Sequence, residues 1–167
     1  MLTGKNRKRL KGLTIAMSLA TVVVLSLLTI YRKECRNYRQ RLFVAAAGQG
    51  RLTRMKMLLA TGADLDAPAC TAPFCVSPLI AAAWGGQTES VELLLDRGAN
   101  VNSASTRGET ALMGPAYHGD TEIVKLLLAK GADVNSADSD GNTALSWANK
   151  KGHQEIADIL ARARVAR

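Results

Sequence analysis

The sequence predicts an all-α fold in which about four helix-turn-helix units stack into a solenoid behind an N-terminal apolar helix. Three observations predict it. A glycine followed by a polar pair and an apolar run recurs after residue 41, at spacings of 36, 33 and 33 residues. Within the units, apolar residues recur every three or four positions, the spacing of one helix face. Ahead of the repeats, residues 12–31 contain no charged residue.

Positive charge is confined to the N-terminal quarter of the chain. Residues 1–41 carry ten Lys or Arg against one Glu, a net of +9, whereas residues 42–167 carry 12 basic and 13 acidic residues, a net of −1. A nearly neutral body lacks the basic stripe that phosphate backbones require, so we expect no nucleic-acid partner. With 47% hydrophobic but only 4% aromatic residues, the composition favours closely packed helices rich in Ala and Leu.

The N-terminal region consists of a basic tail, residues 1–11, and the apolar segment, residues 12–31. Twenty helical residues span about 30 Å, the thickness of a bilayer's hydrocarbon core. We therefore predict a transmembrane helix that is an uncleaved signal anchor. A cleaved signal peptide is the alternative, but the run is longer than a signal h-region and ends without a small-x-small cleavage site.

The charges flanking the apolar segment are almost balanced. Five Lys or Arg precede it, and five follow it in a basic juxtamembrane linker, residues 32–41. A short basic N-terminal tail usually stays in the cytoplasm and sends the rest of the chain across. We therefore expect the repeats on the non-cytoplasmic side.

Each repeated unit contains signals that begin and end its helices. The glycines that mark the period are Gly50, Gly86, Gly119 and Gly152. Gly98 and Gly131 stand where the second helix of a unit ends, a position that favours a left-handed cap. Thr110 and Thr143 are suited to cap the first helix of the next unit. One hairpin cannot bury its apolar stripe alone, so neighbouring units must stack.

Residues 98–102 (GANVN) and 131–135 (GADVN), together with the Thr-Ala-Leu starts, resemble ankyrin repeats. The resemblance implies an ankyrin-repeat helical solenoid over residues 42–167, with units near 42–66, 67–103, 104–136 and 137–167. The first unit lacks a Thr-Pro-Leu start and reads as a capping repeat. The family's His after Thr-Pro-Leu is replaced by Ile80, Met113 and Ser146, so its hydroxyl-imidazole bond is missing.

By this resemblance, finger tips and the concave face of the first helices bind protein partners. The matching positions are Val76, Trp84, Gly85, Thr106, Arg107, Glu109, Tyr117, His118, Ser139, Asp140, Asn142, Lys150 and Lys151. Trp, Tyr and Arg are the residue types that most often anchor interfaces. For Trp84 the alternative is that it fills a gap beside the lengthened second finger. We expect Trp147 to lean inward and His153 to be structural.

The second finger is three residues longer than the others and carries Cys70 and Cys75. In an oxidising compartment, a disulfide closing this six-residue loop would contribute about 2 kcal/mol. The alternative is two unlinked residues in a loop. A zinc site formed by these cysteines with His118 and His153 does not fit, because the spacing is not that of a zinc finger and the histidines belong to separate units. We expect no metal and no other cofactor.

Pro115 stands about five residues into the first helix of the third unit, where a backbone N–H donor begins to be needed. Together with Gly114, it predicts a distorted helix. The distortion is either a tolerated kink or a feature adapted to binding.

No catalytic motif is present in the sequence: it has no Gly-x-Ser-x-Gly, no phosphate-binding glycine-rich loop and no paired His on a helix. We therefore expect neither an enzyme nor a small-molecule substrate; a hydrolase or redox enzyme would need a reactive Cys70 or Cys75. The favoured function is a membrane-anchored scaffold that binds a protein partner as an adaptor or inhibitor, and the resemblance to small bacterial ankyrin proteins places it in a bacterial inner membrane. The alternative is a structural subunit that contacts a membrane complex through its transmembrane helix.

Overall fold

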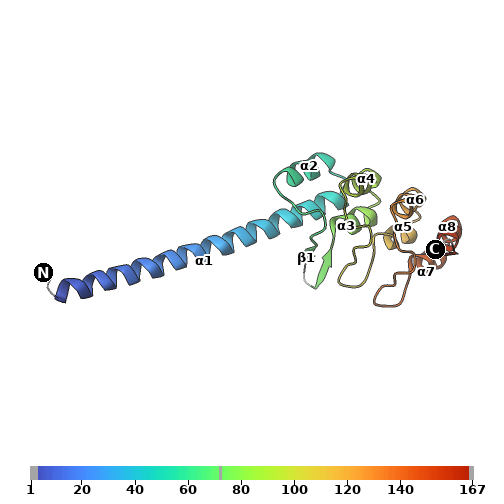
Figure 1. Ribbon diagram of the computed structural model, residues 1–167. Helices are drawn as coiled ribbons and strands as arrows, with labels where there is room; N and C mark the ends of the chain where they lie inside the picture. Colours follow the sequence, from blue (N-terminus) through green and yellow to red (C-terminus); the bar gives the residue numbers. More distant parts are fainter. Residues whose placement is uncertain (1–3, 72, 166–167) are drawn as a thin grey trace. The chain divides into compact units, whose positions relative to one another are not determined.

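The computed structural model describes residues 4–71 and 73–165, with side chains described from residue 22 onward except at 23 and 71. The described residues form eight helices and two short strands in the order α1, α2, β1, β2, then α3 to α8 (Figure 1). They divide into two compact units, Met1–Tyr38 and Arg39–Arg167. The second unit contains the repeats.

Helix α1 (Gly4–Gly48) includes the backbone of the predicted apolar segment and of the basic linker. Residues 32–41 contain no Gly or Pro, so nothing in them ends a helix. Where side chains are described, no helix is long and apolar enough to cross a membrane. Residues 12–21 and 23 of the predicted span lie outside the described side chains. The transmembrane helix therefore stays a prediction.

The first helix pair consists of residues 39–48 of α1 and helix α2 (Leu52–Ala60). Gln40 is buried, and its side-chain amide donates to the carbonyls of Asp64 and Ala67 at 2.8 and 2.6 Å. Its Oε1 accepts from the Asp64 N–H at 3.0 Å. These bonds attach the start of the second finger to the first pair. Phe43, three residues after Gln40, is fully buried. The compact unit thus starts at Arg39, three residues before the repeat pattern begins.

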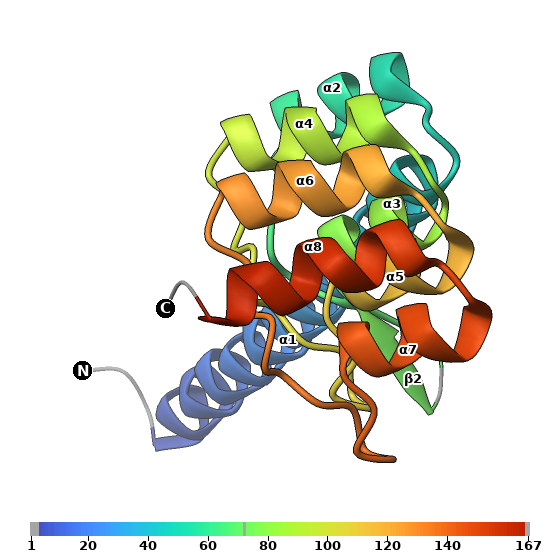
Figure 2. The same cartoon turned by 90° about the vertical axis from the view of Figure 1, so that its right-hand side faces the viewer.

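Three further pairs follow: α3 (Pro78–Trp84) with α4 (Thr88–Asp96), α5 (Met113–His118) with α6 (Thr121–Ala129), and α7 (Ala144–Lys151) with α8 (Gln154–Val165). First helices contact neighbouring first helices, and second helices contact neighbouring second helices (Figure 2). The predicted all-α repeat solenoid is therefore confirmed. Its one addition is an antiparallel hairpin in the second finger, β1 (Ala69–Thr71) and β2 (Phe74–Val76).

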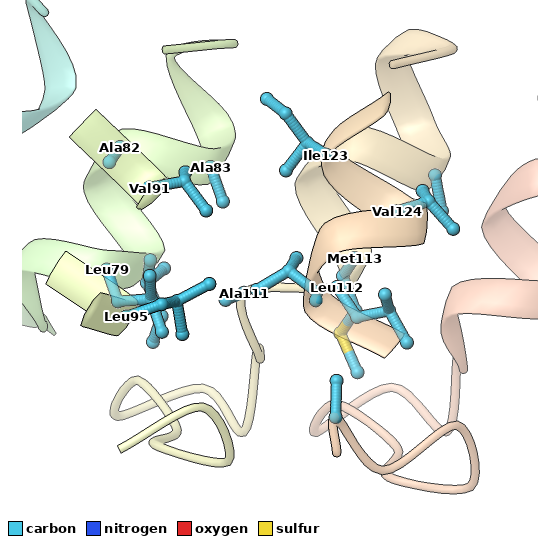
Figure 3. Close-up of a cluster of buried hydrophobic side chains, with 14 of the residues drawn as sticks. Leu79, Ala82, Ala83, Val91, Leu95, Ala111, Leu112, Met113, Ile123 and Val124 are labelled. Carbon is cyan, nitrogen blue, oxygen red and sulfur yellow. The ribbon is translucent and has the colours of Figure 1, made fainter. Parts of the chain in front are cut away.

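The hydrophobic core runs between the pairs as well as within them. Val91 of the second pair and Leu112 and Ile123 of the third are at most 1% exposed. Figure 3 shows such side chains from the two pairs filling the space between them. Fully burying an aliphatic side chain of this size stabilises by about 1.5–3 kcal/mol. Separating the pairs would expose this surface, so each pair depends on its neighbour.

Helix α7 begins as the sequence predicts. The Thr143 hydroxyl accepts from the Ser146 N–H at 3.2 Å, and the Ser146 hydroxyl accepts from the Thr143 N–H at 3.0 Å. This reciprocal capping box satisfies two backbone donors that would otherwise lack partners. Ser146, which occupies the place of the family's His, thus supplies a local bond of its own.

The prediction that Thr110 caps the next helix is wrong. Helix α5 begins only at Met113, and no side chain caps it. Pro115 has no N–H to donate to the Ala111 carbonyl, so the second bond of a helix capped at Thr110 cannot form. Instead the Met113 N–H bonds the Thr110 carbonyl at 3.2 Å in a tighter turn. The predicted distortion of this helix is therefore present, and it shifts the helix start.

Neighbouring fingers are joined by backbone hydrogen bonds. The Thr106 N–H donates to the Cys75 carbonyl at 3.2 Å, and the Ser139 N–H donates to the Arg107 carbonyl at 2.8 Å. In return, the Cys75 N–H donates to the Thr106 hydroxyl at 3.2 Å. The second, third and fourth fingers therefore form one linked row alongside the stacked first helices.

Gly119 tests the packing between the third and fourth units. Its φ is +95°, and a Cβ there would lie 2.8 Å from the His153 ring. Gly131 has a similar φ of +88° with nothing within 4 Å. A left-handed conformation costs a non-glycine residue about 1–2 kcal/mol, so Gly131→Ala should lose about that much.

Gly119→Ala should lose about 1–2 kcal/mol more, because the His153 ring must also move. Chemical denaturation of both variants, followed by circular dichroism, measures the difference. Equal losses in the two variants would contradict the tight packing of His153 on Gly119.

Candidate partner-binding surface

Four ring side chains lie in contact on the first helices of three successive units; we call Trp84, Tyr117, His118 and Trp147 the aromatic row. The Tyr117 ring centroid lies 5.8 Å from that of Trp84 and 5.4 Å from that of Trp147. His118 packs edge-on against Trp84 at 5.7 Å and against Tyr117 at 5.0 Å. Trp84, Tyr117 and Trp147 are half-buried, whereas His118 is exposed. The row therefore offers ring surface to solvent.

Between the second and third units, a glycine on the later unit makes room for a ring from the earlier one. A Cβ at Gly114 would lie 2.9 Å from the Cα and ring of Trp84, so only glycine permits this approach. One period later the position of Gly114 is occupied by Trp147, and Tyr117 packs on its ring. The rings thus overlap from unit to unit.

A cavity of about 320 Å³ opens where the row meets the second finger. Its lining residues are Phe74, Val76, Ile80, Ala81, Trp84 and Glu109. We call it the finger pocket. It joins the hairpin of the second finger to helix α3, and Glu109 of the third finger supplies its only charged wall among the described residues. Its walls are otherwise apolar, which suits an apolar group from a partner.

The hairpin that supplies Phe74 and Val76 is closed by a disulfide. Cys70 and Cys75 are cross-strand partners, with their Cα atoms 4.0 Å apart and their sulfurs bonded. The bond fixes the turn immediately before Phe74, which therefore has fewer conformations available than in an open loop. Because these sulfurs bond each other, and because His153 Nε2 donates to the Tyr117 carbonyl at 3.1 Å, these candidate zinc ligands are already engaged.

Lys150 and Lys151 follow the row at the end of helix α7. Lys151 Nζ lies 4.1 Å from the Tyr117 ring centroid, and Lys150 Nζ lies 4.8 Å from that of Trp147. Such contacts between an ammonium group and a ring contribute about 0.5–1 kcal/mol at exposed sites. Both lysines are exposed, so their charges remain accessible beside the rings.

Asp138 organises the fourth finger next to the row. Its carboxylate accepts hydrogen bonds from the backbone N–H groups of Asp140 and Asn142 at 3.0 and 2.8 Å, and from Trp147 Nε1 at 3.2 Å. Burial alone raises the pKa of Asp138, but the bonds from Asn142, Asp140 and Trp147 outweigh it and hold the pKa below its ordinary value. The carboxylate therefore stays charged and orients the Trp147 ring.

The structure brings some of the predicted binding residues together and uses others to build the fingers. Val76, Trp84 and Glu109 meet at the finger pocket. Tyr117, His118, Lys150 and Lys151 lie in or beside the aromatic row. The remaining predicted residues, Thr106, Arg107, Ser139, Asp140 and Asn142, make hydrogen bonds within or between fingers. Arg107 also places its guanidinium 5.9 Å from the Phe74 ring centroid.

Two aromatic residues of this surface, Phe74 and Trp147, are absent from the sequence-based set of binding residues, as are Ile80 and Ala81 of the pocket wall. Phe74 lies in the lengthened second finger, where the sequence-based transfer named only Val76, although an aromatic residue beside a cysteine-closed turn was a usable signal. Trp147 was expected to lean inward. It is only half-buried, because its indole N–H is held at the surface by Asp138. Gly85 serves packing instead, since a Cβ there would lie 2.3 Å from the Gly48 carbonyl oxygen.

Comparison with protein families agrees with this architecture. A family model described as ankyrin repeats in three copies matches residues 79–166, which is more than half of the chain. A second model, described as ankyrin repeats in many copies, matches residues 42–95. No curated protein matches the chain.

The state of the cysteines is directly measurable. The full chain is isolated under non-reducing conditions without a thiol-blocking reagent, denatured without reductant and treated with a maleimide-polyethylene glycol reagent. One label is expected, on Cys35, which is free in the structure. Three labels are expected after reduction.

A Cys35→Ser variant is the control, with no label before reduction and two after it. Reduction should also lower the stability by about 2 kcal/mol through the freed six-residue loop. Three labels without reductant would show that the finger is open in the cell.

Proposed function

Because the chain belongs to the ankyrin-repeat family, we propose that it is a membrane-anchored scaffold that binds a protein partner through its fingers and first helices and acts as an adaptor or inhibitor. Ankyrin repeats are protein-interaction modules, and they are typically without enzymatic activity. The observation that carries the proposal is the aromatic row beside the finger pocket. Interfaces are enriched in Trp and Tyr at their energetic centres, and here three such rings are half-buried rather than packed away.

The indole N–H of Trp84 takes no part in the proposed contact. Trp84 Nε1 is buried and has no hydrogen-bond partner in the described part of the chain. Leaving a buried donor unpaired costs about 1–3 kcal/mol. Because this N–H is buried, a partner would contact the exposed part of the half-buried ring instead.

The membrane anchor in this proposal is supported by the sequence. Residues 12–31 are uncharged, have the length that spans a bilayer, and are followed by basic residues. A short basic tail favours repeats on the non-cytoplasmic side, and an oxidising compartment suits the Cys70–Cys75 bond. We place the protein in a bacterial inner membrane on the resemblance alone. A tether of this kind would raise the local concentration of the scaffold near membrane partners.

Partner capture tests the proposal. Cross-linking and pull-down of the full chain from native membranes are compared for wild type, Trp84→Ala and Tyr117→Ala. Each variant should reduce capture by about tenfold or more, as truncation of an interface anchor does. The circular dichroism signal should be retained, since both rings are only half-buried.

Met57→Ala is the matched control, because Met57 is an apolar residue 65% exposed on helix α2, away from the row. It should capture as wild type does. Should Trp84→Ala unfold, Trp84→Phe keeps a ring and allows the comparison. Undiminished capture by all folded ring variants would reject the row as the binding surface.

The alternative, a structural subunit that contacts partners through its membrane helix, predicts a different dependence. Replacing residues 1–31 with an unrelated membrane anchor leaves the repeat unit unchanged. A scaffold retains its partner after this exchange. A subunit recognised through residues 12–31 loses it.

A further inference from the structure

We infer that the aromatic row and the finger pocket bind a segment of a protein partner that carries an apolar side chain and, about three residues away, one or more carboxylates. The inference rests on the proposed scaffold function and adds the chemistry of the partner. It follows from the different character of the two ends of this surface.

The apolar end is the finger pocket. Its volume of about 320 Å³ lies at the small end of the range for ligand pockets, about 300–1,000 Å³. Phe74, Val76 and Ile80 line it together with the Trp84 ring. An apolar side chain would bury itself there and displace water at no cost in lost hydrogen bonds. The disulfide-closed hairpin holds Phe74 and Val76 before a partner arrives, which lowers the entropy lost on binding.

The cationic end is formed by Lys150 and Lys151. The ion pairs of the described residues are Lys125 with Glu155 and Lys130 with Asp96. Neither Lys150 nor Lys151 takes part in one. Each ammonium group instead lies over a ring. Lys150 Nζ also donates to Asn142 Oδ1 at 2.5 Å, and both ammonium groups keep further donors for an incoming carboxylate.

In the described part of the chain, no carboxylate forms an ion pair with these two lysines. Asp138 is already occupied by donors from Asp140, Asn142 and Trp147. At the pocket, the opposite charges of Arg107 and Glu109 balance each other. Asp138 and Asp140 of the fourth finger still carry negative charge, so the positive end of the surface is the pair of exposed ammonium groups that lie over the rings. Charge complementarity of this kind selects partners and fixes their register.

The spacing between the two ends follows from the ring contacts. Trp84 lines the pocket and lies 5.8 Å from the Tyr117 ring, which in turn lies 4.1 Å from Lys151 Nζ. An extended chain advances about 3.3 Å per residue. About three residues therefore connect a side chain in the pocket to a carboxylate on Lys151.

A structural role for the two lysines is the simplest competing explanation. They lie in the last turn of helix α7, where positive charge complements the helix dipole by about 0.3–1 kcal/mol. This role needs no partner and predicts an effect on stability alone. Peptide affinity and melting temperature must therefore be measured on the same variants.

The test is a selection of random dodecapeptides displayed on phage against the immobilised full chain in detergent micelles. Enriched peptides should share an apolar residue with Asp or Glu two to four positions away. Selection against Lys150→Glu/Lys151→Glu should instead enrich Lys or Arg at those positions. The best wild-type peptide, labelled with fluorescein, should bind this variant about tenfold more weakly.

Two further variants sharpen the measurement. Lys150→Gln/Lys151→Gln should give an intermediate affinity, because it removes the charge without reversing it. Lys56→Glu/Arg97→Glu makes the same change in net charge at exposed positions outside the row and should alter the affinity by about twofold or less. Wild-type binding should weaken between 50 and 300 mM salt.

The outcomes separate the inference from the function on which it rests. Peptides that need Trp84 but show no acidic preference would overturn the inference and leave the scaffold function standing. Peptides whose affinity changes neither with Trp84→Ala nor with the lysine variants would count against the inference and against the proposed binding surface. Failure to enrich any sequence would contradict the inference, and so would a wild-type oligomer that dissociates on charge reversal, since the occupant would then be a second copy.

Discussion

Burial of apolar stripes between neighbouring helix pairs is the interaction on which the rest of this structure depends. Each pair presents a face that a single hairpin cannot cover, and the next pair covers it. Val91, Leu112 and Ile123 are buried in this way. At the N-terminal side the covering element is the end of helix α1, where Gln40 bonds the start of the second finger. The stack therefore begins with a helix that has no finger of its own.

The same stacking creates the binding surface. Repeating units place equivalent positions of successive first helices side by side, so rings separated by about 33 residues in sequence come into contact. Gly114 allows Trp84 to approach, and Asp138 holds Trp147 where it meets Tyr117. Backbone bonds between fingers keep the hairpin of the second unit in line with the rest. The surface is thus a consequence of the solenoid, shaped by a few residues that depart from the repeat.

The regular part of the fold was predictable from sequence because it repeats. The period, the apolar spacing and the Thr143 cap each have a local physical cause, and the structure agrees with them, whereas the return bond from Ser146 was not predicted. Thr110 was misjudged, because the effect of Pro115 on the helix start outweighed the capping preference of a Thr. Phe74 lies in the second finger, where an insertion interrupts the period, and the finger pocket forms only where that finger meets helix α3 and Glu109 in the folded chain. The partial exposure of Trp147 depends on a hydrogen bond to Asp138, nine residues away, which periodicity does not reveal.

Hydrogen exchange of the full chain in micelles, measured at increasing denaturant, tests most directly whether the pairs hold one another in place. If shared interfaces hold them, amides of α3, α5 and α7 will open together, with one free energy and one dependence on denaturant. Separate openings, each confined to one helix pair and with its own free energy, would contradict stacking as the constraint that fixes both the fold and the aromatic row.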